Sequence, residues 1–255
     1  MPLDSNFLKA VRSVDRNWSM GVELVSPLLY SLIRLARPRS VLEVGAGYST
    51  LFILQALADN LEDFKTSRKK LAGHVRSDRH KGLRRLLKGR HPNPLAVPEY
   101  YETPYRPLLS VIDDTSHPAT SATKVEEVAR ELRLNSFLKF HEGDFRGMAS
   151  RFGEESLPLD LIWFDCGMLR EFLAEYWDLL NPRGGLLLIH TLPSNRTKFA
   201  ALKEFREKLV QSGSAPFETL SLLEPHKWRQ NSVTLIRKMS PGMDAPQVEE
   251  GEAEE

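Results

Sequence analysis

The stretch SVLEVGAGYST, residues 40–50, decides the fold class of this chain. A short apolar run ends at Val44 and is followed by Gly45 and Gly47, and a helix-favouring segment begins at Tyr48. An apolar run that stops at glycine is typical of a buried strand. Glycine lets a ligand approach the backbone, and the first turn of the next helix offers unpaired N–H groups to an anion. The stretch therefore predicts a strand, a ligand-binding loop and a helix.

The rest of the chain repeats this alternation of strands and helices. Apolar runs predict further strands over residues 108–112, 137–141, 159–164, 186–189, 217–223 and 232–237. Helical spacing predicts helices over 5–18, from Ser26 to Pro38, and over 48–58, 121–134, 169–180 and 198–211. Alternating elements favour a mostly parallel sheet covered on both faces, and the last two strands resemble an antiparallel hairpin. We therefore expect an α/β fold with a Rossmann-like, doubly wound sheet of seven strands.

Composition excludes several classes of protein. The 255 residues are 41% hydrophobic and 27% charged, with a net charge of +1, which is typical of one main globular domain. No apolar run approaches the roughly 20 residues of a membrane span, and the first residues lack the apolar core of a secretion signal. The single cysteine, Cys166, excludes an internal disulfide and a cysteine-rich zinc site. We expect a cytoplasmic protein that does not bind membranes.

Charge is unevenly distributed along the chain. Residues 65–91 carry eleven Lys and Arg and one acid, within an insertion, residues 60–107, that interrupts the alternation after the first strand–helix unit. Such a run is either a solvated face or a surface for an acidic partner. Nucleic acid is disfavoured because the tyrosines lie in a separate, proline-rich part of the insertion. Residues 244–255 hold six acids and no base, so 240–255 are predicted to be a disordered tail.

Polar side chains follow five of the predicted strands, at or near the point where each strand ends. They are Glu43, Asp113, Asp144, Asp165, and His190 with Thr191. Parallel strands present their carboxyl ends at one edge of a sheet, where ligands of such folds bind. The set therefore predicts a site. Exposed strand ends are often polar without any function, and this alternative stays open for each residue taken alone.

The glycine loop does not fit a dinucleotide fingerprint. That fingerprint requires a third glycine where this chain has Thr50, and an acid about 20 residues further on. The next acid at a strand end, Asp113, comes only after the long insertion. This spacing counts against an NAD(P)-dependent oxidoreductase, which we keep as an alternative.

The acid-bearing loop E-V-G-A-G, residues 43–47, resembles the first motif of the class I S-adenosylmethionine-dependent methyltransferases, in particular their small O-methyltransferase-like branch. The segment NPRGGLLLIH, residues 181–190, is similar to the fifth-strand signature of that family. The resemblance extends in element order from Leu28 to Lys238, although the usual third glycine of the loop is Ser49. It implies the seven-stranded fold, methyltransferase activity and S-adenosyl-L-methionine as cofactor.

The resemblance also implies which residues bind the cofactor. An acid after the second strand binds the ribose, with Asp113 as first choice and Asp114 as second, and one after the third strand lies near the adenine. The fourth-strand Asp165 lies near the transferred methyl. The expected cofactor-binding residues are Glu43, Gly45, Gly47, Ser49, Asp113, Asp114, Asp144 and Asp165.

The acceptor side carries the expected catalytic residues, His190 and Asp165. His190 is a candidate base because imidazole titrates near neutral pH, and Thr191 is expected to contact the substrate beside it. Tyr101 and Tyr105 are expected to line an aromatic wall if the insertion forms a lid. The catechol-type branch of the family holds Mg²⁺ with carboxylate and amide oxygens at the place of His190 and Thr191, so we expect no metal here.

We therefore expect an enzyme that methylates an oxygen of a small molecule or a peptide. Residues 39–239 would be its catalytic domain, and residues 1–38 would cap the acceptor or form a homodimer contact. A third reading is a non-catalytic adaptor that binds an acidic partner through residues 65–91.

Overall fold

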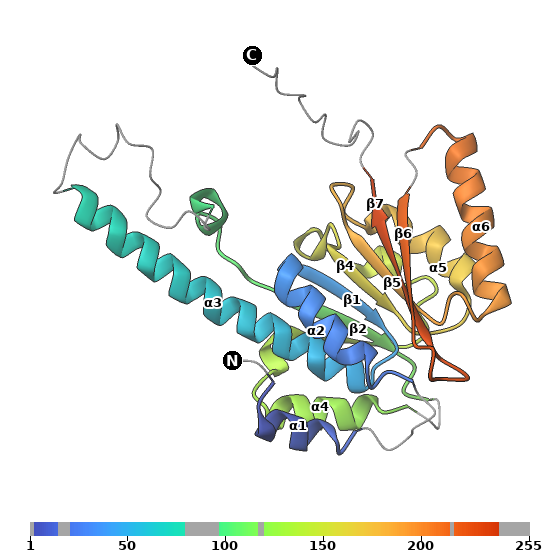
Figure 1. The fold of residues 1–255 in the computed structure, drawn as a ribbon, viewed down its shortest axis with the longest axis horizontal. Coiled ribbons are helices and arrows are strands. Elements are labelled where there is room, and N and C mark those ends of the chain that lie inside the picture. Colours follow the sequence, from blue (N-terminus) through green and yellow to red (C-terminus); the bar gives the residue numbers. More distant parts are fainter. Residues whose placement is uncertain (1–2, 15–20, 80–96, 117–119, 215–216, 240–255) are drawn as a thin grey trace, which may run out of the picture. The chain divides into compact units, whose positions relative to one another are not determined.

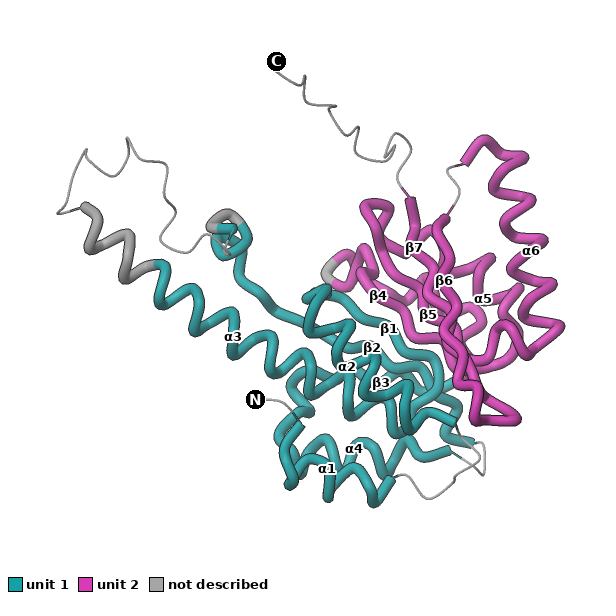
Figure 2. The backbone as a smooth tube through the Cα atoms, in the orientation of Figure 1, with its two compact units in different colours: residues 1–143 teal, residues 144–255 magenta. Residues whose placement is uncertain are grey.

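The structure is a computed structural model and describes residues 3–14, 21–79, 97–116, 120–214 and 217–239. The chain divides into two compact units, residues 1–143 (unit 1) and residues 144–255 (unit 2), shown in Figure 2. The boundary predicted after residue 38 falls inside unit 1. The predicted acidic tail lies outside the described residues.

The described residues contain seven strands in one sheet, in the order β3-β2-β1-β4-β5-β7-β6 (Figure 1). Pairing is parallel between β1, β2 and β3 and between β4 and β5, and antiparallel where β7 joins β5 and β6. The predicted fold class is thus confirmed. The strands are β1 Ser40–Val44, β2 Leu108–Asp113, β3 Leu138–Glu142, β4 Leu161–Phe164, β5 Leu186–His190, β6 Phe217–Leu223 and β7 Ser232–Lys238.

The inner strands are the apolar runs of the sequence. All four residues of β4 are buried, as are four of the five in β1, which is expected of strands covered on both faces. The edge strand β6 is buried only at Phe217. No helix in the described part of the chain combines the length and the apolar character needed to cross a bilayer.

Unit 1 has four helices among its described residues: α1 Ser5–Val11, α2 Val25–Ala36, α3 Tyr48–Arg79 and α4 Ala122–Glu131. Both α2 and α4 contact α3, and Phe7 of α1 packs edge-on against Phe52 of α3, with 5.1 Å between ring centroids. The first helix is shorter than predicted, and residues 15–20 lie outside the described part.

The start predicted for α2 at Ser26 was wrong. The helix begins at Val25, and Leu24 is its N-cap. The Ser26 hydroxyl does not cap the helix but donates to the Val22 carbonyl oxygen at 2.7 Å. The predicted helix over 48–58 was too short, because α3 continues to Arg79.

Contacts with α2 explain why α3 continues past residue 58. Asn60 is fully buried and its Nδ2 donates to the Ile33 carbonyl oxygen at 2.8 Å, while its Oδ1 accepts from Arg34 at 2.7 Å. Arg34 also forms an ion pair with Asp63 at 2.6 Å. Asn60 and Asp63 therefore hold this part of α3 against α2.

The insertion returns to the sheet through a short 3-10 helix, η3 Pro98–Tyr101, and enters β2 at its first residue, Leu108. Leu108 pairs with Ser40, the first residue of β1. The described parts of the insertion beyond Phe64 therefore lie toward the edge of the sheet where β1 and β2 begin. Gly45 lies at the opposite edge, where they end.

In unit 2, α5 Leu169–Tyr176 continues as a 3-10 helix, η7 Trp177–Leu179, so the predicted helix over 169–180 changes type in its last turn. The helix α6 Arg196–Gln211 begins after Asn195, whose Oδ1 accepts from the Lys198 backbone N–H at 3.0 Å. The remaining short 3-10 helices are η4 Asn135–Phe137 in unit 1, and η5 Ala149–Arg151 and η6 Glu154–Ser156 in unit 2.

Candidate active site

The loop between β1 and α3 is fastened to the end of β2. Gly45 adopts a φ of 98°, a conformation that residues with a Cβ rarely adopt. Its N–H donates to the Ile112 carbonyl oxygen at 2.9 Å, which continues the pairing of the two strands. The next N–H, that of Ala46, donates to Asp113 Oδ2 at 2.7 Å. The Asp113 carboxylate therefore fixes the backbone of the glycine loop at Ala46.

Asp113 is half-buried and keeps capacity for a ligand. Its Oδ1 accepts from the Thr120 hydroxyl at 2.6 Å, so each oxygen has one protein donor. An ionised carboxylate offers about four lone-pair sites, which leaves roughly one on each oxygen. Asp114 is exposed and its Oδ1 accepts from the Ser116 N–H at 3.0 Å, which closes a local turn.

Glu43 and Ser49 lie beneath the loop. The Ser49 hydroxyl donates to Glu43 Oε1 at 2.6 Å, and the two residues are 0% and 3% exposed. Their hydrogen bond joins the end of β1 to the first turn of α3. Both residues are in a position to hold the loop's shape, and neither offers surface to a ligand.

Sequence reasoning missed two residues that complete the loop, Thr120 and Ser121. The Ser121 hydroxyl donates to the Ala46 carbonyl oxygen at 3.0 Å. A Cβ placed on Gly47 would lie 3.7 Å from this hydroxyl oxygen, which is an ordinary contact. Their signal is weak, because short hydroxyl side chains before a helix usually serve as caps.

In unit 2, Asp165 and His190 form a hydrogen-bonded pair at the ends of β4 and β5. Asp165 Oδ1 lies 2.7 Å from His190 Nδ1. Because an ionised carboxylate only accepts, Nδ1 is the donor of this pair. The His190 side chain is 2% exposed, whereas that of Asp165 is 25% exposed. Asp165 is therefore the accessible member.

Lys198, which the sequence analysis did not single out, lies behind this pair. It is 6% exposed and its Nζ donates to the His190 carbonyl oxygen at 2.8 Å and to the Thr191 hydroxyl at 3.4 Å. Burial lowers the pKa of this ammonium, and the negative charge of Asp165 acts in the opposite sense. A signal existed, since Lys198 shares the buried helical face of Ala201 and Leu202.

Thr191 follows β5 with a φ of 62°, which is rare for a β-branched residue. Its backbone N–H donates to the Ser232 carbonyl oxygen at 2.8 Å. Beside Asp165, Cys166 is a free thiol whose pKa burial raises to about 12. Cys166 is thus a protonated side chain at neutral pH.

Asp144 lies at the start of unit 2 and accepts from Arg146 Nε at 2.9 Å. This hydrogen bond holds the pKa of the Asp144 carboxyl below its ordinary value. Among the residues that the structure describes, no group of three or more His, Cys, Asp or Glu side chains is placed to hold a metal ion.

The structure does not bring Tyr101 and Tyr105 to the glycine loop. Tyr101 stacks on Phe64 of α3, with 5.2 Å between ring centroids. Tyr105 is 2% exposed and its hydroxyl donates to the Pro38 carbonyl oxygen at 2.8 Å. Both tyrosines pack the far part of α3 against the start of β2.

The profile of a family described as a methyltransferase domain matches residues 42–191 of the chain. The chain belongs to this methyltransferase domain family. The match runs from β1 to just beyond β5, so it spans the glycine loop, Asp113 and the Asp165–His190 pair. No curated protein matches the methyltransferase.

Solved structures share the fold of the methyltransferase at low identity. The O-methyltransferase TomG from Streptomyces achromogenes, in complex with SAM, is 15% identical over 93% of this chain and 91% of that chain, with a TM-score of 0.56. The SAH-bound methyltransferase PaMTH1 from Podospora anserina is 14% identical over 92% and 88%, with a TM-score of 0.57. An O-methyltransferase from Bacillus cereus in complex with SAH is 13% identical over 93% and 91%, with a TM-score of 0.54.

Proposed function

We propose that this methyltransferase uses S-adenosyl-L-methionine to methylate an oxygen atom of a small molecule or a peptide, without a metal. The observation that carries the proposal is the Asp113 carboxylate, fastened to the Ala46 N–H beside two glycines and still able to accept hydrogen bonds. A ribose presents two hydroxyl donors, which match the free lone pairs of such a carboxylate.

The residues of the loop fit the cofactor in a second way. Gly45 and Gly47 leave the backbone bare, so an amino-acid chain can lie against it. Asp113 would bind the ribose, and Glu43 with Ser49 would keep the loop in shape beneath it. When bound, S-adenosylmethionine supplies a methyl group on a positively charged sulfur. The protein's task is then to orient the acceptor and exclude water.

We place Asp165, and not His190, against the acceptor. Asp165 is the exposed member of the pair, and its carboxylate can accept the proton of an acceptor hydroxyl. His190 would orient Asp165 through Nδ1, and Lys198 would hold the backbone of His190. Asp144 and Asp114 remain candidates for further cofactor contacts.

Metal independence rests on the donor set. A hard cation such as Mg²⁺ prefers oxygen ligands, and the residues after β4 and β5 offer a thiol, an imidazole and one hydroxyl beside Asp165. Activity that EDTA leaves unchanged would support this part of the proposal, and activity restored only by added Mg²⁺ would contradict it.

The printed descriptions of the similar structures agree with this proposal. Two of them are O-methyltransferases, and the three were solved with SAM or SAH. At identities of 13% to 15% they support the class of reaction and give no acceptor.

Calorimetric titration with S-adenosylhomocysteine tests the cofactor. We expect binding to the wild type, and about a tenfold higher Kd for Asp113→Asn, because charge-assisted hydrogen bonds to the ribose become neutral ones. Asp114→Asn is the matched control and should change the Kd less. Binding of NAD(P) with no binding of S-adenosylhomocysteine would overturn the proposal in favour of an oxidoreductase.

The acceptor is tested by turnover. Phenols, carboxylic acids, amines and peptides are each incubated with the enzyme and S-adenosylmethionine, and S-adenosylhomocysteine formation is measured. We expect turnover with an oxygen acceptor. Turnover confined to amines would contradict the proposal that the acceptor atom is an oxygen. An acidic protein that binds but is never methylated would favour the adaptor alternative.

A further inference from the structure

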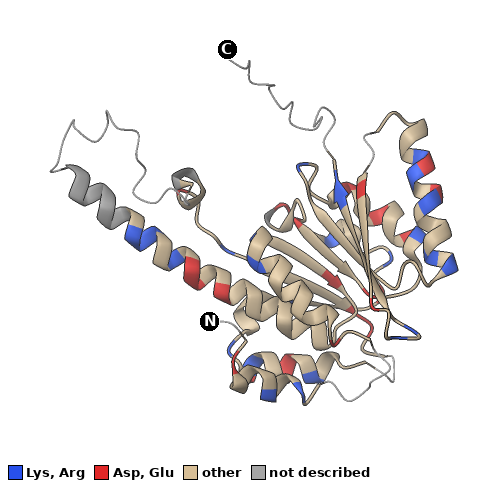
Figure 3. Cartoon of the chain, in the orientation of Figure 1, with Lys and Arg blue, Asp and Glu red and all other residues tan. Residues whose placement is uncertain are grey.

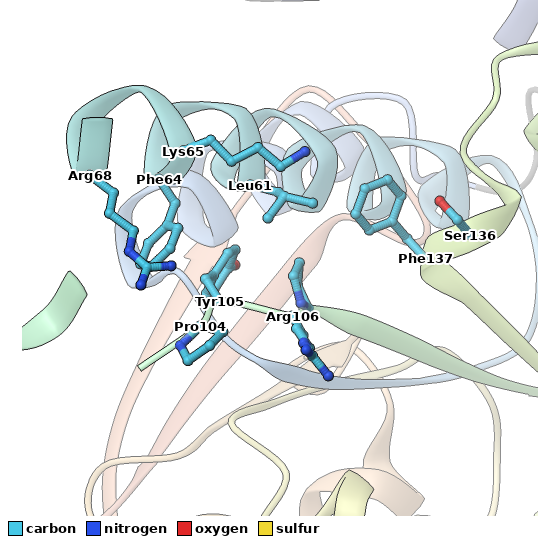
Figure 4. A pocket seen from close by; sticks show the side chains of 10 residues that line it. Leu61, Phe64, Lys65, Arg68, Pro104, Tyr105, Arg106, Ser136 and Phe137 are labelled. Carbon is cyan, nitrogen blue, oxygen red and sulfur yellow. The ribbon is translucent and has the colours of Figure 1, made fainter. Parts of the chain in front are cut away.

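A pocket of about 440 Å³ lies between α3 and the segments that enter β2 and β3 (Figure 4). It belongs wholly to unit 1. Phe64 and Arg68 point from α3 toward Pro104 and Tyr105, and Phe137 closes another side. Its volume is within the range of small-molecule sites, about 300–1,000 Å³.

The charged lining of this pocket is entirely basic. Lys65 and Arg68 come from α3 and Arg106 from the segment before β2, and none of the lining residues is acidic. All three side chains are exposed, and among the described residues none of the three forms an ion pair or a hydrogen bond. By contrast, Arg34 of α2 forms an ion pair with Asp63. Three unneutralised cations around one hollow attract an anion.

The aromatic part of the apolar lining is packed against neighbouring rings. Phe64 packs against Tyr101 and Tyr105, with ring centroids 5.2 and 5.8 Å apart. Tyr105 is fixed by its hydrogen bond to Pro38. Desolvation by burial raises the pKa of Tyr105, so it stays neutral and adds no negative charge to the pocket. A planar ligand body can therefore pack here without first ordering these side chains.

The pocket is remote from the glycine loop. Phe64 lies sixteen residues after Tyr48 in one helix, which is about 24 Å at 1.5 Å per residue. The strand β2 separates Pro107 from Asp113 by about 20 Å in the same direction. A ligand in this pocket does not occupy the proposed cofactor site.

From this juxtaposition we propose that the pocket is a second binding site, for a small anion with an aromatic or aliphatic body. Arg68, Arg106 and Lys65 bind the anionic group, a carboxylate or a phosphate, and guanidinium groups match either geometrically. The rings of Phe64 and Phe137 cover the apolar body. Figure 3 shows Lys and Arg in blue on α3, between the acidic part of the helix and its grey end.

Calorimetric titration of the full chain with phenyl phosphate tests the site, and 3-phenylpropionate in a second arm distinguishes phosphate from carboxylate recognition. We expect at least one of them to bind, and inorganic phosphate and benzyl alcohol to bind roughly tenfold more weakly, since each lacks half of the recognised structure. Binding should weaken as salt rises. No binding of either aryl anion would overturn the proposal.

Arg68→Glu and Lys69→Glu form a matched pair of variants. The two residues are neighbours on α3 and the charge change is equal, but only Arg68 lines the pocket. We expect Arg68→Glu to raise the Kd about tenfold and Lys69→Glu to change it less than about twofold. An equal loss of affinity in the two variants would mean that the anion is attracted diffusely to a basic surface, and would overturn the proposed site.

Two further readouts locate the bound anion. Amide NMR signals of Arg106 and Phe137 should shift on titration while that of Gly45 does not. Saturating S-adenosylhomocysteine should leave the Kd of the aryl anion unchanged. Displacement by S-adenosylhomocysteine would assign the anion to the cofactor site and overturn the proposal, while leaving the proposed function intact.

Discussion

At the scale of single residues, the candidate site depends on carboxylates whose partners are far away in the sequence. The strand-end position of Asp113 could be predicted, because apolar runs mark where strands stop. Its bond to the Ala46 N–H could not, since the two residues are 67 positions apart and meet only when β1 and β2 pair. The burial of His190 was equally hidden, because it depends on packing against Trp163 of the neighbouring strand.

Asp165 and His190 can be separated by substitution. We expect Asp165→Asn to lower kcat about a hundredfold or more, because an amide accepts no proton from the acceptor. His190→Asn keeps a donor toward Asp165 and should lower kcat only about threefold. His190→Phe removes that donor and should cost roughly tenfold. An equal loss in Asp165→Asn and His190→Asn would make the imidazole itself the base.

Cys166 provides a pH-dependent prediction. Because burial raises its pKa from 9.0 to about 12, iodoacetamide should alkylate the folded protein at pH 9 far more slowly than an unfolded control. Between pH 9 and about 12 the folded state binds more protons at this thiol than the unfolded state does. This contribution to stability is therefore complete below pH 9 and is lost as pH rises toward 12. Alkylation at equal rates would contradict the burial of the thiol.

At the scale of elements, the strands were predicted well and the long helix was not. Each predicted strand formed within two residues of its expected ends. For inner strands such as β1 and β4, burial on both faces demands a nearly unbroken apolar sequence. The extent of α3 was missed because the regular alternation of elements breaks at Asn60, although the basic residues that follow favour a helix. The contacts of Asn60 and Asp63 with α2 appear only in the folded unit. The start of α2 was missed because the Ser26 hydroxyl donates to the Val22 carbonyl oxygen and does not cap the helix.

The turn before β5 offers a test of packing. A Cβ on Gly185 would lie 2.8 Å from the Asn181 carbonyl oxygen and 2.8 Å from Leu180 Cγ, too close for either to remain in place. We expect Gly185→Ala to destabilise the fold by about 1–3 kcal/mol, measured by denaturant unfolding. Gly167→Ala is the control, because a Cβ there meets nothing within 4 Å. An unchanged midpoint for Gly185→Ala would show that this turn can shift at little cost.

At the scale of the whole molecule, the predicted site residues fall in both compact units. The glycine loop, Asp113 and Asp114 belong to unit 1, and Asp144, Asp165 and His190 belong to unit 2. The sequence predicted one catalytic domain over residues 39–239 and did not predict this division. It could not predict the basic pocket, because Arg106 and Phe137 precede different strands and meet α3 only in the folded unit.

Binding of the cofactor product should stabilise the fold. S-adenosylhomocysteine at a hundred times its Kd should raise the free energy of unfolding by about 2.7 kcal/mol, since it binds only the native state. For a chain of this size that is a rise of several degrees in Tm, roughly 2–4 °C per kcal/mol. NAD⁺ at the same concentration should leave Tm unchanged. A rise with NAD⁺ alone would favour the oxidoreductase alternative.

The length of α3 has a consequence for how this sequence can diverge over time. Its 32 residues span about 48 Å, whereas the five residues of β1 span about 17 Å. The helix is therefore much longer than this strand, and its last turns extend beyond the length of β1. Selection acting on the core cannot constrain those turns, so we expect them to drift quickly among orthologous chains. Retention of Lys65, Arg68 and Arg106 while those last turns drift would indicate a bound ligand.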